Sequence, residues 1–216
     1  EILRIIDRDL SLGLLEGNPI PVPKTFKESE KPVPVPVERT GRPYTFKERK
    51  LTASELEYWQ QYGITSEILE QYKVCSVVQF QSENADGNPF SYSSTKEEPI
   101  YGYKNKRFIK LYRPFSKTRF LYGGNIGENY CFGLEQLPSK GDTLFITGGE
   151  KDVLSLAAKG FHAICFNSET VTVPPNIIYK LTFRFKHIIL LYDMDATGIE
   201  SAKKHEKQLC EYGVKR

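Results

Sequence analysis

Two aspartates, Asp193 and Asp195, follow directly after the apolar run at residues 187–192. If that run is a buried strand, side chains at alternate positions project to the same side of it. Two carboxylates held this close repel each other unless a cation lies between them. Carboxylate oxygens without histidine or cysteine favour Mg²⁺ or Mn²⁺. Asp195 by itself fits an ordinary helix N-cap, but the pair directly after a strand indicates a metal site.

A second polar stretch, TGGEKD at residues 147–152, ends another apolar run. Its two glycines permit a ligand to approach the backbone closely. Asp152 can cap the helix expected after it, and the positive end of such a helix attracts phosphate. Glu150 is either a metal ligand or a solvated turn residue, and the spacing does not decide between the two.

Basic and aromatic residues are interleaved over residues 101–124, which contain no acidic residue. Basic groups neutralise phosphates and aromatic rings stack on bases, so this segment is a candidate site for single-stranded nucleic acid or nucleotides. The alternative is an amphipathic hairpin with a solvated basic face. Either way, we expect the charged groups of Lys110 and Arg113 to reach solvent. The seven basic residues are Lys104, Lys106, Arg107, Lys110, Arg113, Lys117 and Arg119.

The region from residue 142 onward alternates between short apolar runs and helical patterns. The apolar runs are residues 144–147, 162–166 and 187–192, and the helical patterns are residues 152–160, 174–183 and 197–213. This alternation predicts βαβ units and a parallel sheet. Ligand sites in such sheets lie at the carboxyl ends of the strands. Both acidic stretches, residues 147–152 and 193–195, follow such strand ends.

Upstream of residue 142 the patterns change. Residues 74–134 mix β-branched and aromatic residues with turn residues, strongest at 83–88, and predict a curved, mostly antiparallel sheet. Residues 51–73 predict a helical hairpin around Gly63, with Thr52 and Glu55 as a capping box. Residues 17–50 hold seven of the thirteen prolines and predict an extended linker. Residues 1–16 predict an amphipathic helix. The expected domains are therefore 51–140 and 141–216.

Composition limits the class of protein. The 216 residues carry 30 Lys+Arg against 27 Asp+Glu, so a net charge of +3 excludes a strongly basic chain but not a local basic patch. The four cysteines form no CxxC pair, so we expect no structural zinc site and a reducing, cytoplasmic compartment. No apolar run approaches the length of a membrane span. The first residue is Glu1, and we expect the sequence to be a piece of a longer protein.

Two long stretches resemble a Toprim domain, the catalytic fold of bacterial-type primases, topoisomerases and some nucleases. They are LFITGGEKDVLSLAAKGFHAICFNSE and HIILLYDMDATGIESAKKHEKQL. Upstream, FIKLYRPF, FLYGG and FGLEQL resemble the basal domain that precedes Toprim in bacterial primases and phage primase–helicases. The resemblance covers about residues 50–216. It implies an α+β basal domain followed by an α/β Toprim domain.

The resemblance also implies an activity, which is RNA primer synthesis on a single-stranded DNA template from ribonucleoside triphosphates with Mg²⁺ or Mn²⁺. It implies a replicative helicase as partner and a phage or mobile-element setting. Asp193 and Asp195 match the metal-binding aspartates of the family, and Asp152 matches the aspartate of its first motif. Lys110 matches a lysine of the basic segment, and Gly149 matches the glycine of the first motif.

The sequence departs from the family at two points. The first motif of the family has Glu-Gly at the strand end, and aligning Gly149 with that glycine leaves Gly148 in place of the glutamate. Either Glu150 substitutes, or this copy is impaired. The last acidic motif of the family lies beyond Arg216. The departures leave two other functions open: a Toprim nuclease, and a degenerate module that binds nucleic acid without catalysis.

Overall fold

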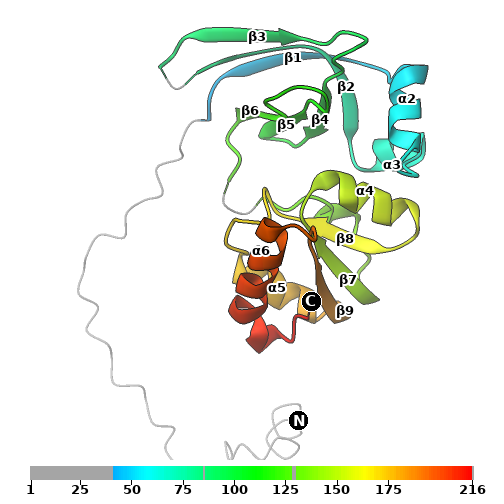
Figure 1. Ribbon diagram of the computed structural model, residues 1–216, viewed down its shortest axis with the longest axis vertical. Helices are drawn as coiled ribbons and strands as arrows, with labels where there is room; N and C mark the ends of the chain where they lie inside the picture. The colour runs from blue at the N-terminus through cyan, green and yellow to red at the C-terminus, as the bar shows by residue number, and fades with distance from the viewer. Residues whose placement is uncertain (1–40, 85, 128–129, 216) are drawn as a thin grey trace, which may run out of the picture. The chain divides into compact units, whose positions relative to one another are not determined.

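The computed structural model describes residues 41–84, 86–127 and 130–215. The helix expected at residues 1–16, and the proline-rich segment as far as residue 40, lie outside the described residues. Within the described residues, no helix combines the length and the apolar character needed to cross a membrane. Figure 1 shows that the described chain contains an antiparallel sheet followed by a parallel sheet.

The antiparallel sheet has the strand order β1-β2-β4-β5-β6, and β3 also pairs with β2. Each of its strand pairs is antiparallel, which confirms the predicted sheet. Its strand β5, which lies between β4 and β6, is buried along its whole length. The strands are β1 (Tyr44–Arg49), β2 (Val74–Glu83), β3 (Pro89–Ser93), β4 (Tyr101–Lys104), β5 (Phe108–Tyr112) and β6 (Phe120–Gly124).

Strand β1 corrects the expectation that the linker extends to residue 50. The last proline of the proline-rich region is Pro43, and the next six residues pair with β2. Tyr44 and Phe46 alternate with more exposed neighbours, and the ring of Tyr44 lies 6.4 Å from that of Phe80. A proline-free segment with alternating aromatics can therefore join the sheet as an edge strand.

Turn and cap chemistry confirm two local predictions. In the turn between β2 and β3, the side-chain oxygen of Asn84 accepts hydrogen bonds from the backbone N–H groups of Asp86 and Asn88, both at 2.9 Å. Helix α2 (Ala53–Gln60) begins with the expected capping box of Thr52 and Glu55. Helix α3 (Ser66–Gln71) follows the turn at Gly63.

The parallel sheet has the strand order β8-β7-β9 and confirms the predicted βαβ units. Its strands are β7 (Gly141–Thr147), β8 (His162–Cys165) and β9 (Phe185–Leu191). The helices that connect and follow them are α4 (Glu150–Ala158), α5 (Pro175–Thr182) and α6 (Ala196–Gln208). Two short 3₁₀ turns, η1 (Leu134–Gln136) and η2 (Cys210–Tyr212), complete this part.

One hydrophobic core joins the two predicted domains. Trp59, Leu69 and Tyr101 from the first domain are buried in the same cluster as Val153 and Leu154 of α4. Packing of this kind fixes α4, and the loop at its start, against the antiparallel sheet. Side chains of strand β5 can therefore contact the start of α4.

Candidate functional site

The carboxyl ends of β7, β8 and β9 lead into three acidic loops. Thr147, Cys165 and Leu191 end the three strands, and β7 lies between the other two in parallel register. Besides Glu150, four carboxylates follow these ends, and we call these four the acidic edge: Asp152, Glu169, Asp193 and Asp195. This position is where parallel sheets place their ligand sites.

Asp195 is the N-cap of α6 in addition to being a member of the acidic edge. Its side-chain oxygen accepts a hydrogen bond of 2.8 Å from the backbone N–H of Gly198. Asp193 is exposed. A side chain at position 198 would collide with the backbone of Asp193, so glycine there lets the loop turn closely back over the start of the helix.

The carboxylates of the acidic edge interact with one another electrostatically. Burial raises the pKa of Asp152, and the negative charge of Asp193 raises it further. Burial also raises the pKa of Glu169, with added repulsion from Asp193, Asp195 and Asp152. Negative charges that raise the pKa of Asp152 and Glu169 in this way create a site that favours a cation or a proton.

Sequence reasoning did not single out Glu169. Its Oε2 atom lies 3.1 Å from the place that a Cβ at position 148 would occupy. That oxygen is buried, and no described residue hydrogen bonds to it. The carboxylate of Glu169 therefore faces the space left by the side chain that Gly148 lacks. The signal in the sequence was the position of Glu169, in the loop after the second apolar run, because all three strands of a parallel sheet end at one edge.

Glu150 is in a different environment, and of the two alternatives left open by the sequence, the solvated turn residue is wrong. It begins α4 and is only 2% exposed. Its Oε1 atom accepts hydrogen bonds of 2.6 Å from both the ammonium of Lys110 and the hydroxyl of Tyr130. A carboxylate that is buried and neutralised by lysine is a poor candidate for a metal ligand.

Lys110 and Arg113 correct a second expectation, because neither charged group reaches solvent freely. The Lys110 side chain is 3% exposed, and its ammonium also donates to the carbonyl of Asn167 at 3.0 Å. The Arg113 side chain is 12% exposed, lies 3.8 Å from Glu98 and stacks 4.3 Å from the ring centre of Tyr92. Long-range packing buries both side chains, and the charge pattern of the segment alone did not reveal this.

The other basic residues of the segment fall into two groups at opposite ends of β5. Lys104, Lys106 and Arg107 precede the strand, whereas Lys117 and Arg119 follow it. Five residues of strand span about 15 Å, so the structure does not join these residues into one patch. Lys104 pairs with Glu48 at 2.7 Å, and Arg119 lies 3.4 Å from the Tyr112 hydroxyl.

Comparison with known proteins agrees with this architecture. Residues 145–216 match the family described as Toprim-like. No curated protein matches the sequence significantly.

Several solved primase structures share the fold. The structure of the DnaG catalytic core is 17% identical with a TM-score of 0.57, and the match covers 76% of this chain and 62% of that one. The DnaG primase catalytic domain bound to ssDNA is 16% identical with a TM-score of 0.56, at 74% and 62% coverage. The Escherichia coli primase catalytic core is 16% identical with a TM-score of 0.54, at 74% and 61% coverage.

The chain thus carries a Toprim-like domain and has the fold of a bacterial primase catalytic core, which confirms the resemblance and the fold class predicted from the sequence. It spans about 62% of the length of those cores. At this level of identity the likeness concerns the fold.

Proposed function

We propose that this chain is the catalytic core of a DNA primase, which makes RNA primers on single-stranded DNA from ribonucleoside triphosphates. The observation that carries the proposal is the acidic edge, where carboxylates from the ends of all three parallel strands are electrostatically coupled. In the reaction, a 3′-hydroxyl attacks the α-phosphate of the incoming nucleotide, and pyrophosphate leaves.

Asp193 and Asp195 would hold Mg²⁺ or Mn²⁺, because carboxylate oxygens are the ligands these ions prefer. In residues 41–84, 86–127 and 130–215, no three acidic, histidine or cysteine side chains are arranged to hold one ion. One or two carboxylates, completed by water and substrate phosphate, are the usual protein contribution to such a site. When bound, the ion would stabilise negative charge on the transferring phosphate.

Other residues would accept the proton of the attacking hydroxyl and contact the substrate phosphates. Glu169 is the carboxylate beside Gly148 and is our candidate to accept the proton of the attacking hydroxyl. The exposed residues Arg107 and Lys117 are candidates to contact phosphates. Lys110 and Glu150 would instead position the start of α4, which carries Asp152. A replicative helicase is proposed as partner on the family resemblance alone.

The test is to incubate the 216-residue chain with single-stranded DNA and labelled ribonucleotides in Mg²⁺ or Mn²⁺. Short labelled RNA products that disappear in Asp193→Asn support the primase. Shortened DNA would identify a nuclease instead. DNA that is bound but unchanged would identify a non-catalytic module, the alternative that Gly148 favours.

A further inference from the structure

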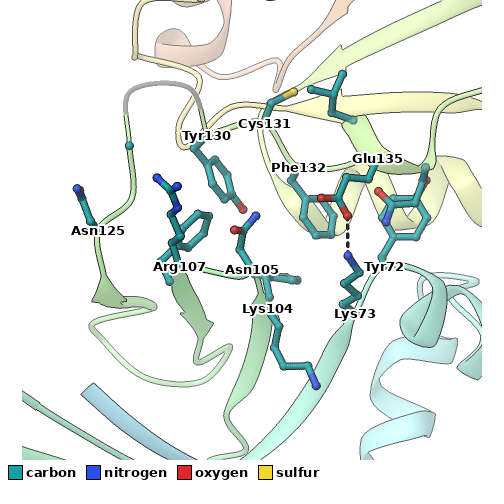
Figure 2. A pocket seen from close by; sticks show the side chains of 16 residues that line it. Tyr72, Lys73, Lys104, Asn105, Arg107, Asn125, Tyr130, Cys131, Phe132 and Glu135 are labelled. Carbon is teal, nitrogen blue, oxygen red and sulfur yellow. Dashed lines mark hydrogen bonds and ion pairs between the residues drawn. The ribbon is translucent and has the colours of Figure 1, made fainter. Parts of the chain in front are cut away.

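A cavity of about 460 Å³ lies beside the antiparallel sheet, and its described lining includes none of the carboxylates of the acidic edge. Its walls come from the turn between β4 and β5, the turn between α3 and β2, and residues 125, 127 and 130–136 (Figure 2). Its volume is in the range of about 300–1,000 Å³ that is typical of small-molecule sites. It is large enough to admit a planar ring system.

One wall of the cavity is aromatic. The ring of Phe132 is only partly buried and is backed by Tyr103 at 5.3 Å and Tyr72 at 5.5 Å between ring centres. Tyr130 lies 5.4 Å from Phe108 and also lines the cavity. Figure 2 shows Asn105 between Tyr130 and Phe132 in that view. Rings held by their neighbours in this way can stack on a flat ligand at little cost in side-chain entropy.

Asn105 and Arg107 have polar side-chain groups that no described residue contacts. Both are exposed and line the cavity, and within the described part of the chain nothing pairs with either side chain. An amide and a guanidinium are the groups that hydrogen bond in pairs to the edges of bases. Arginine also binds phosphate through two parallel hydrogen bonds.

The charge of the rim favours an anion. Lys73, Lys104 and Arg107 line the cavity, and the acidic residue of the described lining is Glu135. Lys104 is paired with Glu48, so Arg107 is the cation of the lining that has no acidic partner among the described residues. Glu135 pairs with Lys73 at 2.6 Å, and both side chains are more than half exposed. Exposed pairs of this kind are weak, so a phosphate can compete with Glu135 for the lysine.

Lys73 also has an unusual backbone conformation. Its φ of +57° is the only positive value among non-glycine residues in the described part of the chain. This left-handed position at a helix end is normally glycine. A lysine there places a cation at the rim of the cavity at a conformational cost, which points to a role for its side chain.

A second cavity lies next to this one. It has a volume of about 450 Å³ and shares Gly127 and Tyr130 with the first. Its far wall includes Asn167 and Val171, which flank Glu169 in the sequence. The two cavities therefore meet at Gly127 and Tyr130, and residues of the loop that carries Glu169 line the second one.

We propose that the cavity lined by Asn105, Arg107 and Phe132 binds one unpaired nucleobase together with its phosphate. The inference rests on the proposed function, because it assigns a part of the substrate to a place outside the acidic edge. The base would stack on Phe132, its edge would hydrogen bond to Asn105, and its phosphate would face Arg107 and Lys73. A base of this kind comes either from the DNA strand or from a free ribonucleotide.

The experiment measures binding of three probes by the full 216-residue chain. They are a fluorescent oligothymidylate, a strand of the same length with abasic sugars, and free ribonucleoside triphosphates. The variants are Asn105→Ala and Arg107→Ala, with Lys106→Ala as control. Lys106 carries the same charge as Arg107 and lies beside it on the same turn, but it does not line the cavity.

We expect Asn105→Ala to weaken binding of a base-bearing probe about tenfold and to leave the abasic strand unchanged, since a paired contact to a base contributes on this order. Arg107→Ala should weaken binding of both strands by more than Lys106→Ala does, because its guanidinium faces the phosphate. Lys106→Ala should weaken both strands by one small and equal factor. A loss confined to oligothymidylate assigns the base to the strand, and a loss confined to triphosphates assigns it to the nucleotide. Circular dichroism spectra should be unchanged, because both side chains are exposed.

Equal losses on base-bearing and abasic strands in Asn105→Ala, or losses in Arg107→Ala no larger than those in Lys106→Ala, would overturn the base pocket. That result leaves the proposed function intact, because strand binding itself persists. If the unaltered chain bound neither strands nor nucleotides, the pocket and the primase function would both be wrong.

Discussion

Lys110 shows how one contact can change the role that sequence assigns to a residue. Its ammonium is buried between Glu150 and the carbonyl of Asn167 and lies 4.8 Å from the ring centre of Phe120. Removing one member of a buried ion pair leaves the other charge unpaired in an apolar setting. We therefore assign Lys110 a positioning role between β5 and α4.

Lys110→Ala should lower the free energy of unfolding by about 3–5 kcal/mol. The double variant Lys110→Met with Glu150→Gln should recover much of that loss, because no buried charge is left alone. Lys117→Ala, an exposed change in the same segment, should shift stability by no more than about 0.5 kcal/mol. Urea unfolding curves check all three. Equal stability of Lys110→Ala and Lys117→Ala would contradict the buried pair.

Gly148 and Glu169 form a second pair of residues whose effects should depend on each other. A glutamate at position 148 would place its Cβ 3.1 Å from Oε2 of Glu169 and add a like charge. Gly148→Glu should therefore destabilise the metal-free protein. Gly148→Glu combined with Glu169→Gln should restore both stability and primer synthesis, whereas Glu169→Gln alone should lower synthesis roughly 100-fold. Additive effects in this double-mutant cycle would show that the two positions act independently.

The raised pKa of Glu169 predicts how stability depends on pH. Because its pKa in the folded state lies above its ordinary value of 4.5, the folded state binds the proton more tightly than the unfolded chain does. Ionisation of Glu169 therefore destabilises the folded state. This destabilisation is absent well below pH 4.5, grows as pH rises, and is complete above the pKa of Glu169 in the folded state. Glu169→Gln does not titrate, so its stability advantage over wild type should increase from pH 4 to pH 7 in metal-free buffer.

Glu67 provides the opposite control for this measurement. A hydrogen bond from Thr65 lowers the pKa of Glu67. Ionised Glu67 therefore contributes favourably to folding stability above its ordinary pKa. This contribution is lost as pH falls through the pKa of Glu67 in the folded state. The stability of Glu67→Gln relative to wild type should therefore decrease over the same rise in pH. If both variants showed the same trend, the assigned environments would be wrong.

Helix α6 gives Asp195 two separable roles, as cap and as member of the acidic edge. Asp195→Ala removes the acceptor for the Gly198 N–H and should cost about 1 kcal/mol of stability. Asp195→Ser keeps a capping oxygen but removes the charge, so it should be close to wild type in thermal unfolding. Both variants should lose primer synthesis. A fully active Asp195→Ser would show that the residue is a cap and nothing more.

Across the chain, the sequence predicted the parts that depend on local pattern. The alternation of apolar runs and helices predicted the parallel sheet, and Thr52, Glu55 and Asn84 marked a cap and a turn. The burial of Lys110 was not predictable from local pattern, since its partner Glu150 is 40 residues away in the sequence. Glu169 was missed because loop residues carry no periodicity, and its relation to Gly148 exists only once β7 and β8 are paired.

If the acidic edge binds a divalent ion, the stability of the folded chain must depend on that ion. An ion that binds only the folded state stabilises it by mass action, by about 1.4 kcal/mol at ten times the dissociation constant. For a domain of this size that corresponds to a rise in Tm of about 3–6 °C. The measurement is a melting curve after removal of metal with a chelator and titration with Mg²⁺ or Mn²⁺. Asp193→Asn should abolish the rise, while Asp142→Asn, an exposed aspartate paired with Lys186, should keep it. An equal rise in both variants would mean that the ion acts through general charge screening and that the acidic edge holds none.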